Sequence, residues 1–214
     1  MKPLAVVCVS GGMDSCLTAA IAAAEHRLAF LHANYGQRTE ARELQCFHRL
    51  AEHFRAERTL VVDFSHLRAI GGSSLTDPTV PVHEGPPVPG VIPTSYVPFR
   101  NAHLLSAAAS WGEALGASAI FVGAVWEDSS GYPDCRPEFY RAFEHAIREG
   151  MRPETELRIV TPVISLTKFT VPGLGSYTAR VVIYDGAYAG TWGDATHGGK
   201  MFGKIVKNPP APPQ

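Results

Sequence analysis

The chain has 214 residues, of which 45% are hydrophobic and 18% are charged, and its formal net charge is −1. This length favours one globular domain with at most a small appendage, and the apolar fraction excludes wholesale disorder. The near-neutral charge argues against a protein that grips nucleic acid by neutralising phosphates, and no apolar run approaches the roughly 20 residues that span a bilayer.

Strand and helix patterns alternate along most of the chain. The valine-rich run at residues 4–9 is typical of a strand buried on both faces, and it fits that role better than a signal peptide. Further strands are expected at 28–34, 59–64 and 119–125, and helices at 16–25, 39–56, 101–115 and 137–150. This order predicts an α/β fold with a parallel sheet, right-handed crossovers and helices on both faces.

Two segments depart from this alternation. Residues 71–98 are rich in glycine and proline, and a loop this long is usually a functional lid or a disordered stretch. Beyond residue 169 the pattern becomes all-β, with strands expected at 176–184, 187–192 and 200–207 and a turn at Asp185-Gly186. We therefore expect an α/β domain at residues 1–168 and a β-rich tail at residues 169–214.

A glycine turn follows the first strand. It reads Ser10-Gly11-Gly12-Met13-Asp14-Ser15 and leads into a helix. Glycines let the backbone approach an anion closely, and the amides at the helix N-terminus then point at that anion. The lysine of a Walker loop is missing. A plain turn is the alternative, but the six-residue pattern favours an ATP-binding loop.

The turn resembles the signature of the PP-loop ATP pyrophosphatases, whose fold is the adenine nucleotide alpha-hydrolase-like, Rossmann-like sheet. Further blocks, taken in chain order, resemble the 7-cyano-7-deazaguanine synthase family over residues 4–168. These blocks are Asn34-Tyr35-Gly36-Gln37-Arg38, Gly71-Gly72-Ser73-Ser74-Leu75-Thr76-Asp77, Tyr96-Val97-Pro98-Phe99-Arg100-Asn101 and the segment from Ser130 to Phe139.

The resemblance implies an ATP-dependent carbon–nitrogen ligase. Its substrates would be 7-carboxy-7-deazaguanine, ammonia and ATP, and its product the nitrile precursor of queuosine. The carboxylate would be adenylated and converted to an amide, which a second ATP would activate before the nitrile forms. The resemblance also implies Mg²⁺ on the phosphates and a homodimer. The four scattered cysteines, with no Cys-x-x-Cys pair, favour reduced thiols and a cytoplasmic location. The charge and the lack of a long apolar run predict neither nucleic-acid nor membrane partners.

Residue roles follow from the same resemblance. The turn residues Ser10, Gly11, Gly12, Met13, Asp14 and Ser15 would bind the nucleotide, with Asp14 also holding Mg²⁺. Arg100 would contact phosphate, although an arginine that only begins a helix is the alternative. Tyr132, Asp134 and Arg136 would bind the substrate. The alternatives are that Tyr132 only packs in the protein and that Asp134 and Arg136 form an ion pair that fixes their loop. The catalytic set would be Asp14, Arg136 and Lys168.

Gln37 and Arg38 are weaker candidates for the site. Cys135 could be a nucleophile, but it lacks a histidine nearby in sequence, so a packed thiol is favoured.

The end of the chain departs from the family pattern. The family implies structural zinc on a C-terminal cysteine cluster, whereas the four cysteines here are Cys8, Cys16, Cys46 and Cys135. The favoured explanation of the tail is a spliced fragment of another β protein. The two alternative explanations are a divergent branch of the family that replaced its metal module and a degenerate homologue that binds nucleotide without completing the synthesis. Two rival functions therefore remain: a nucleotide-binding homologue without turnover, and a PP-loop ligase that acts on a different acid.

Overall fold

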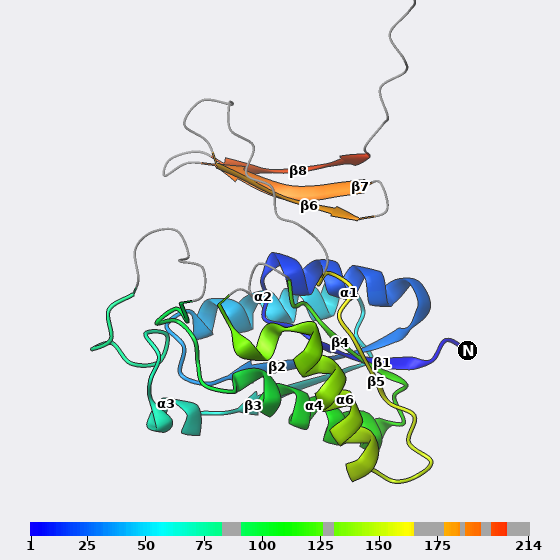
Figure 1. Cartoon of the computed structure of the whole chain (residues 1–214). Helices are drawn as coiled ribbons and strands as arrows, with labels where there is room; N and C mark the ends of the chain where they lie inside the picture. The colour runs from blue at the N-terminus through cyan, green and yellow to red at the C-terminus, as the bar shows by residue number, and fades with distance from the viewer. Residues whose placement is uncertain (83–90, 126–130, 165–177, 185–186, 194–197, 205–214) are drawn as a thin grey trace, which may run out of the picture. The chain divides into compact units, whose positions relative to one another are not determined.

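Five parallel strands form the sheet of the first unit, Met1–Ser165 (Figure 1). The computed structural model describes residues 1–82, 91–125 and 131–164, and three further strands by their backbone. The strand order is β3-β2-β1-β4-β5, which confirms the Rossmann-like parallel sheet. The strands are β1 (Leu4–Cys8), β2 (Arg27–Asn34), β3 (Arg58–Asp63), β4 (Ala119–Val122) and β5 (Arg158–Val160).

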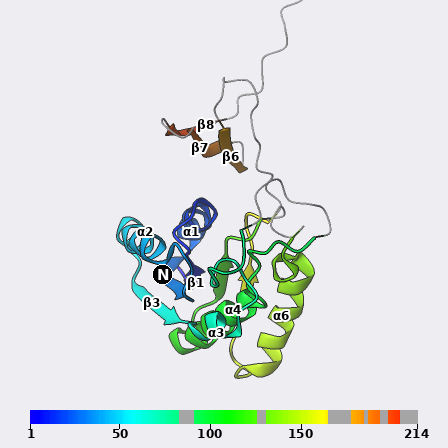
Figure 2. The same cartoon turned by 90° about the vertical axis from the view of Figure 1, so that its left-hand side faces the viewer.

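Helices cover both faces of this sheet, as the alternating pattern predicts. Figures 1 and 2 show α1 and α2 on one face and α4 and α6 on the other. The helices are α1 (Met13–Glu25), α2 (Glu40–His53), α3 (His66–Ile70), α4 (Arg100–Leu115) and α6 (Pro137–Gly150), with a 3₁₀ turn η1 at Pro133–Cys135.

The central strand β1 supplies both halves of the core. All five of its residues are buried. Val7 packs with Phe30 and Phe47 on the α1/α2 face, while Val6 packs with Leu105 on the α4/α6 face. Each such side chain contributes roughly 1.5–3 kcal/mol when it is fully buried. This two-sided burial explains why β1 reads as an unbroken apolar run.

Some boundaries differ from the sequence prediction. Helix α1 begins at Met13, inside the glycine turn, rather than at residue 16. Strand β4 ends at Val122 rather than at residue 125, and the next residue, Gly123, lies against the backbone of Asp14. The helix α3 and the three-residue strand β5 were not predicted, since neither is long enough to show a periodic pattern.

The described parts of the long glycine- and proline-rich segment pack on the residues that follow β2 and β3. Ser73 and Ser74 are fully buried, and the Ser74 amide donates to the Thr94 carbonyl at 2.8 Å. Val97 joins Tyr35 in a small apolar cluster that also includes Leu67, Phe64 and Leu75. These contacts attach both ends of the segment to the residues that follow β2.

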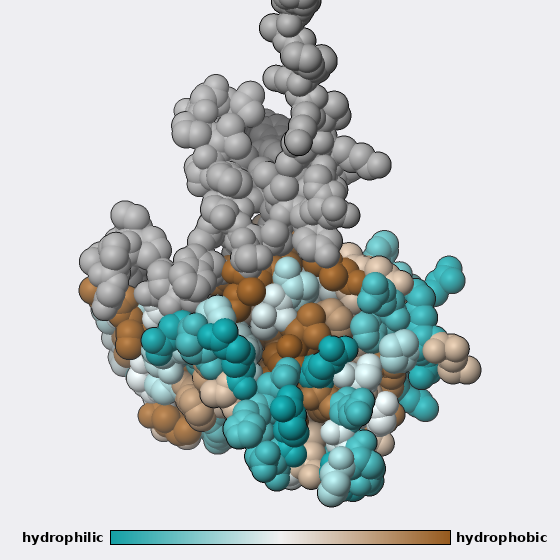
Figure 3. Space-filling model, turned by 45° about the vertical axis from the view of Figure 1, so that its right-hand side comes forward, coloured by the Kyte–Doolittle hydropathy of each residue, from teal (hydrophilic) through white to brown (hydrophobic). Residues whose placement is uncertain are grey.

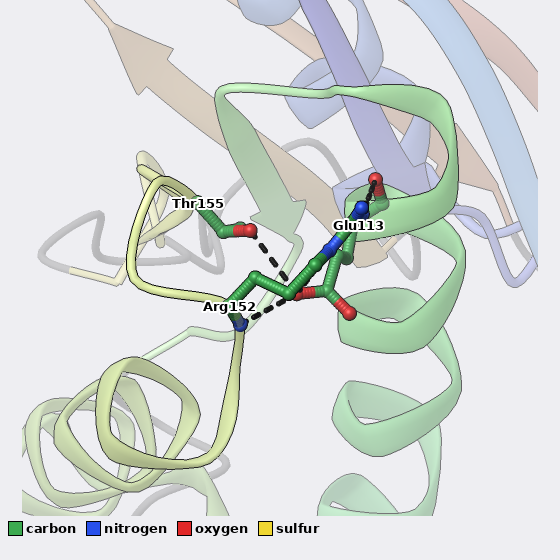
Figure 4. A network of polar contacts seen from close by, with 3 residues as sticks. All are labelled: Glu113, Arg152 and Thr155. Carbon is green, nitrogen blue, oxygen red and sulfur yellow. Dashed lines mark hydrogen bonds and ion pairs between the residues drawn. The ribbon is translucent and has the colours of Figure 1, made fainter.

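A polar network fixes the chain after α6 to the end of α4 (Figure 4). The Glu113 Oε1 atom accepts hydrogen bonds from the Arg152 amide at 2.9 Å and from the Thr155 hydroxyl at 3.0 Å. Arg152 also pairs with this carboxylate through its Nε atom at 3.4 Å. The hydrogen bond from the Arg152 amide, helped by those from Thr155 and the Arg152 side chain, lowers the pKa of Glu113.

The second unit, Leu166–Gln214, contains three antiparallel strands in the order β6-β7-β8. They are β6 (Thr178–Tyr184), β7 (Ala187–Gly193) and β8 (Gly198–Lys204), and Tyr184 pairs with Ala187 across the first connection. The predicted turn at 185–186 lies outside the described residues. The assignment of residues 169–214 as a replacement for the family's C-terminus stays a prediction.

None of the helices in the described ranges is long and apolar enough to cross a bilayer. Figure 3 shows hydrophilic side chains interspersed with smaller hydrophobic areas on the visible face of the first unit. The exposed large apolar side chains, such as Ile70 and Phe99, are scattered along the chain, as on most folded proteins.

Candidate active site

The glycine turn between β1 and α1 is tightly constrained at Gly11. This residue has φ +83°, and a Cβ atom built there would lie 2.8 Å from both the Cys46 Cβ atom and the Glu43 carbonyl oxygen. A left-handed backbone and a contact this close both exclude larger residues. The turn therefore keeps its shape by packing directly on α2.

The serines of the turn hold its backbone in place. The Gly12 amide donates to the Ser10 Oγ atom at 3.3 Å, and the Ser15 hydroxyl donates to the Gly12 carbonyl at 2.9 Å. Gly12 is the N-cap of α1 and supplies no side-chain cap. The amides of the first helical turn have no partner within the helix, so they can bind an anion.

The end of β4 closes against this turn. A Cβ atom at Gly123 would lie 3.0 Å from the Asp14 carbonyl and the Ser15 amide, so glycine is needed for the approach. Strands β1 and β4 are neighbours, and the strand order reverses between them. Open α/β sheets bind ligands outside the carboxyl ends of the strands at such a point.

A cavity of about 360 Å³ lies at this reversal. Residues from the glycine turn, the ends of three strands and the start of α4 surround it. The lining comprises Cys8, Val9, Ser10, Gly12, Asp14, Ser15, Leu31, His32, Ala33, Tyr35, Glu43, Leu75, Arg100, Asn101, Leu104, Val122, Gly123, Ala124, Cys135 and Tyr140. The turn and Arg100, predicted separately as phosphate contacts, thus share one cavity.

Arg100 brings a positive charge to this cavity. Its Nη1 atom donates to the Tyr35 hydroxyl at 2.9 Å, and its guanidinium lies 5.4 Å from the centre of the Tyr35 ring. Burial opposes the charge, but the attraction and hydrogen bond of Tyr35 outweigh it and raise the pKa of Arg100. Among the described residues no carboxylate forms an ion pair with Arg100. The Arg100 guanidinium can therefore form an ion pair with an anionic ligand.

Asp134 is buried and is used to hold the start of α4. Its Oδ2 atom accepts the Asn101 amide at 2.9 Å, and the Asn101 side chain donates to the Asp134 carbonyl at 3.1 Å and to the Cys135 sulfur at 3.2 Å. Asp134 does not line the cavity, whereas Asn101 and Cys135 do. These bonds position Arg100, which precedes Asn101 directly.

The other predicted substrate contacts also lie outside this lining. The Tyr132 and Ser95 hydroxyls are 2.7 Å apart, which fixes the Tyr132 ring. Arg136 is exposed, donates to the Pro133 carbonyl at 3.1 Å, and borders a separate hollow with Asp134. Lys168 falls outside the described residues. Substrate binding by Tyr132, Asp134 and Arg136, and catalysis by Arg136 and Lys168, stay predictions.

Gln37 and Arg38 serve the loop after β2. The Gln37 side chain accepts a hydrogen bond from the Tyr35 amide at 2.9 Å and donates one to the Glu43 carboxylate at 3.0 Å. Gln37 thus fixes the backbone of Tyr35. Arg38 is exposed, and its amide bonds to the Leu75 carbonyl at 3.2 Å. Neither residue lines the cavity.

Cys8, His32 and Tyr140 are among the cavity residues that sequence reasoning missed. Burial raises the pKa of Cys8 to about 12, so it remains a thiol. The His32 Nδ1 atom lies 2.7 Å from the Val9 carbonyl and must carry the proton that it donates. Tyr140 comes from α6 and is 4% exposed. All three occupy positions that an apolar pattern marks only as core.

Asp14 and Glu43 are the carboxylates of the cavity lining. Their oxygens suit Mg²⁺ bound together with phosphates, which themselves supply ligands. In the part of the chain that the structure describes, no group of three or more His, Cys, Asp or Glu side chains could hold a metal ion. The sequence contains no cysteine after Cys135, so residues 169–214 do not fit a four-cysteine zinc site.

Known proteins match most of the chain. The model of the family described as "Queuosine biosynthesis protein QueC" matches residues 4–191. The 7-cyano-7-deazaguanine synthase of Chloroherpeton thalassium is 56% identical over 168 residues, 78% of this chain and 74% of that protein. The enzyme of the same name from Acidobacterium capsulatum is 51% identical over 175 residues, 80% of this chain and 76% of that protein.

A solved structure shares a more distant likeness. It is the predicted subunit of a tRNA methyltransferase from Methanocaldococcus jannaschii, with a TM-score of 0.45 and 14% identity over 77% of this chain and 69% of that one. A likeness at this level carries no functional argument.

Proposed function

The chain belongs to the queuosine biosynthesis protein QueC family, and on this premise we propose that it converts 7-carboxy-7-deazaguanine and ammonia into 7-cyano-7-deazaguanine with two molecules of ATP. The observation that carries the proposal is the shared cavity. The glycine turn and Arg100, which lie far apart in sequence, line it together at the point where the strand order reverses.

The reaction proceeds in two activations. The acid's carboxylate oxygen attacks the α-phosphate of ATP, pyrophosphate leaves, and ammonia then displaces AMP to give the amide. The amide oxygen attacks a second ATP, pyrophosphate leaves again, and loss of AMP and two protons leaves the nitrile. Both carboxyl oxygens thus depart on AMP. ATP creates the leaving groups, so no side-chain nucleophile is required.

The residues of the cavity act on the charge that develops. Departing pyrophosphate gathers negative charge, which preorganised amides of the turn and the guanidinium of Arg100 stabilise. Removing one such donor costs roughly 10²–10³-fold in rate in other enzymes. Asp14 is the proposed Mg²⁺ ligand, with Glu43 on the same lining.

Release of pyrophosphate in the presence of 7-carboxy-7-deazaguanine and ammonia tests this function. We expect two pyrophosphates per nitrile, and only background release when the acid is omitted. Release only with other heteroaromatic acids would identify a ligase of different specificity instead.

A second candidate is a nucleotide-binding homologue without turnover. The absence of cysteine after Cys135 favours it, because the family resemblance implies a zinc module there. Binding of ATP without release of pyrophosphate under the conditions above would support this candidate and refute the ligase.

We also propose a cytoplasmic homodimer that acts on small molecules and has neither nucleic-acid nor membrane partners. Light scattering of the purified chain measures the oligomeric state directly, and a monomeric mass would refute the dimer.

A further inference from the structure

Tyr140 presents an unused polar atom at the cavity. The residue lies on α6, is 4% exposed and belongs to the cavity lining. Its hydroxyl oxygen is buried and has no hydrogen-bond partner among the described residues. Buried hydroxyls in folded proteins nearly always have a partner, so this one calls for a ligand or a trapped water.

Aliphatic side chains share the cavity lining with Tyr140. Leu104 from α4 and Val122 and Ala124 from the end of β4 line the same cavity, and Cys135 there accepts the Asn101 side chain. A flat ring inserted against this wall would bury its faces on aliphatic carbon. Its edge would then meet the phenol.

The phenol stays neutral in this environment. Burial, as the largest cause, raises the pKa of Tyr140, and the nearby Asp134 carboxylate acts in the same direction. A neutral phenol can both donate and accept a hydrogen bond. It therefore suits a ring edge that carries both kinds of atom.

We propose that the Tyr140 hydroxyl binds the edge of a planar nitrogen heterocycle held in this cavity. The inference rests on the proposed function, which supplies two such rings: the base of the nucleotide and the ring of the deazaguanine acid. Both are bicyclic and carry ring nitrogens and exocyclic polar groups. A ring without an edge atom at this place would leave the phenol unpaired, so Tyr140 discriminates between ligands.

The test is Tyr140→Phe, which removes only the hydroxyl. Calorimetric titration measures the binding of a non-hydrolysable ATP analogue and, separately, of 7-carboxy-7-deazaguanine. We expect one of the two affinities to fall by about 10-fold, the effect of losing one neutral hydrogen bond, and the other to stay constant. Stability without ligand should be unchanged or higher, because an unpaired buried hydroxyl is lost.

Tyr96→Phe is the matched control. The Tyr96 hydroxyl accepts the Phe99 amide at 3.0 Å, and Tyr96 does not line the cavity. This variant should lose stability while it binds both ligands as the wild type does. The two substitutions delete the same atom, one from an unpaired site and one from a paired site.

The two titrations show which ring binds at Tyr140, and they distinguish failure of this inference from failure of the proposed function. Weaker binding of the ATP analogue identifies the base as the ring at Tyr140, and weaker binding of the acid identifies the deazaguanine. Unchanged affinity for both ligands, with or without a loss of stability, would overturn the inference and leave a trapped water as the partner. If the wild-type chain binds nucleotide but no acid, the proposed function fails while the nucleotide titration still tests Tyr140.

Discussion

Replacing Gly11 by alanine probes whether packing on α2 fixes the shape of the glycine turn. At φ +83° an alanine pays about 1–2 kcal/mol for the left-handed backbone. Its Cβ atom would also lie 2.8 Å from the Cys46 Cβ atom and the Glu43 carbonyl oxygen, and overpacking of this kind adds about 1–3 kcal/mol. We therefore expect a loss of about 2–5 kcal/mol in the free energy of unfolding, measured in urea by circular dichroism.

Gly116→Ala separates the two contributions. Gly116 has φ +64° at the end of α4, and no heavy atom lies within 4 Å of a Cβ atom built there. This variant should lose only the backbone share, about 1–2 kcal/mol. Equal losses in the two variants would refute the reasoning, because they would mean that α2 yields to the added methyl group.

Three further predictions concern other parts of the first unit. Arg100→Met should weaken binding of a non-hydrolysable ATP analogue by roughly 10–100-fold, because charged hydrogen bonds are worth about 1.5–3 kcal/mol. The far-ultraviolet circular dichroism spectrum should stay unchanged. Calorimetry measures the affinity, and an unchanged value would exclude Arg100 as a phosphate contact. Asp134→Ala should lower the free energy of unfolding by about 1–3 kcal/mol, because the buried Asn101 amide loses its acceptor; a urea titration with no shift in midpoint would contradict this. The lowered pKa of Glu113 stabilises the fold above the glutamate's unfolded-state pKa, and this stabilisation is lost as the pH falls through the folded-state value. Glu113→Gln should thus flatten the acid side of the stability profile, and a profile parallel to that of the wild type would exclude the network in Figure 4 as its source.

The sequence was most informative where burial or backbone geometry left few choices. An apolar run without alternation, such as Leu4–Cys8, has few uses other than a strand covered on both faces. The glycine turn was equally clear, because close backbone approach to an anion requires glycine at fixed positions. The turn and Arg100 were therefore predicted as anion-binding groups, and the structure brings both to one cavity.

The rest of the site depended on packing that no local pattern encodes. Tyr140 lies on the buried face of α6 with Ile147, so its spacing marks it as core whether or not its hydroxyl meets a ligand. Asp134 reads as a ligand-binding carboxylate because it follows a strand and a loop, yet its Oδ2 atom is bonded to the Asn101 amide. Only the tertiary contacts between η1 and α4 distinguish these uses.

The positions of Asp14 and Gly123 have a consequence for synthesis and for evolution. The two residues touch in the folded chain but are 109 positions apart in the sequence, from 14 to 123. During translation the turn emerges early, yet its pocket stays incomplete until Tyr140 has left the ribosome. The wall residues within the described ranges all precede the second unit, so an exchange of sequence downstream of residue 165 would change none of them.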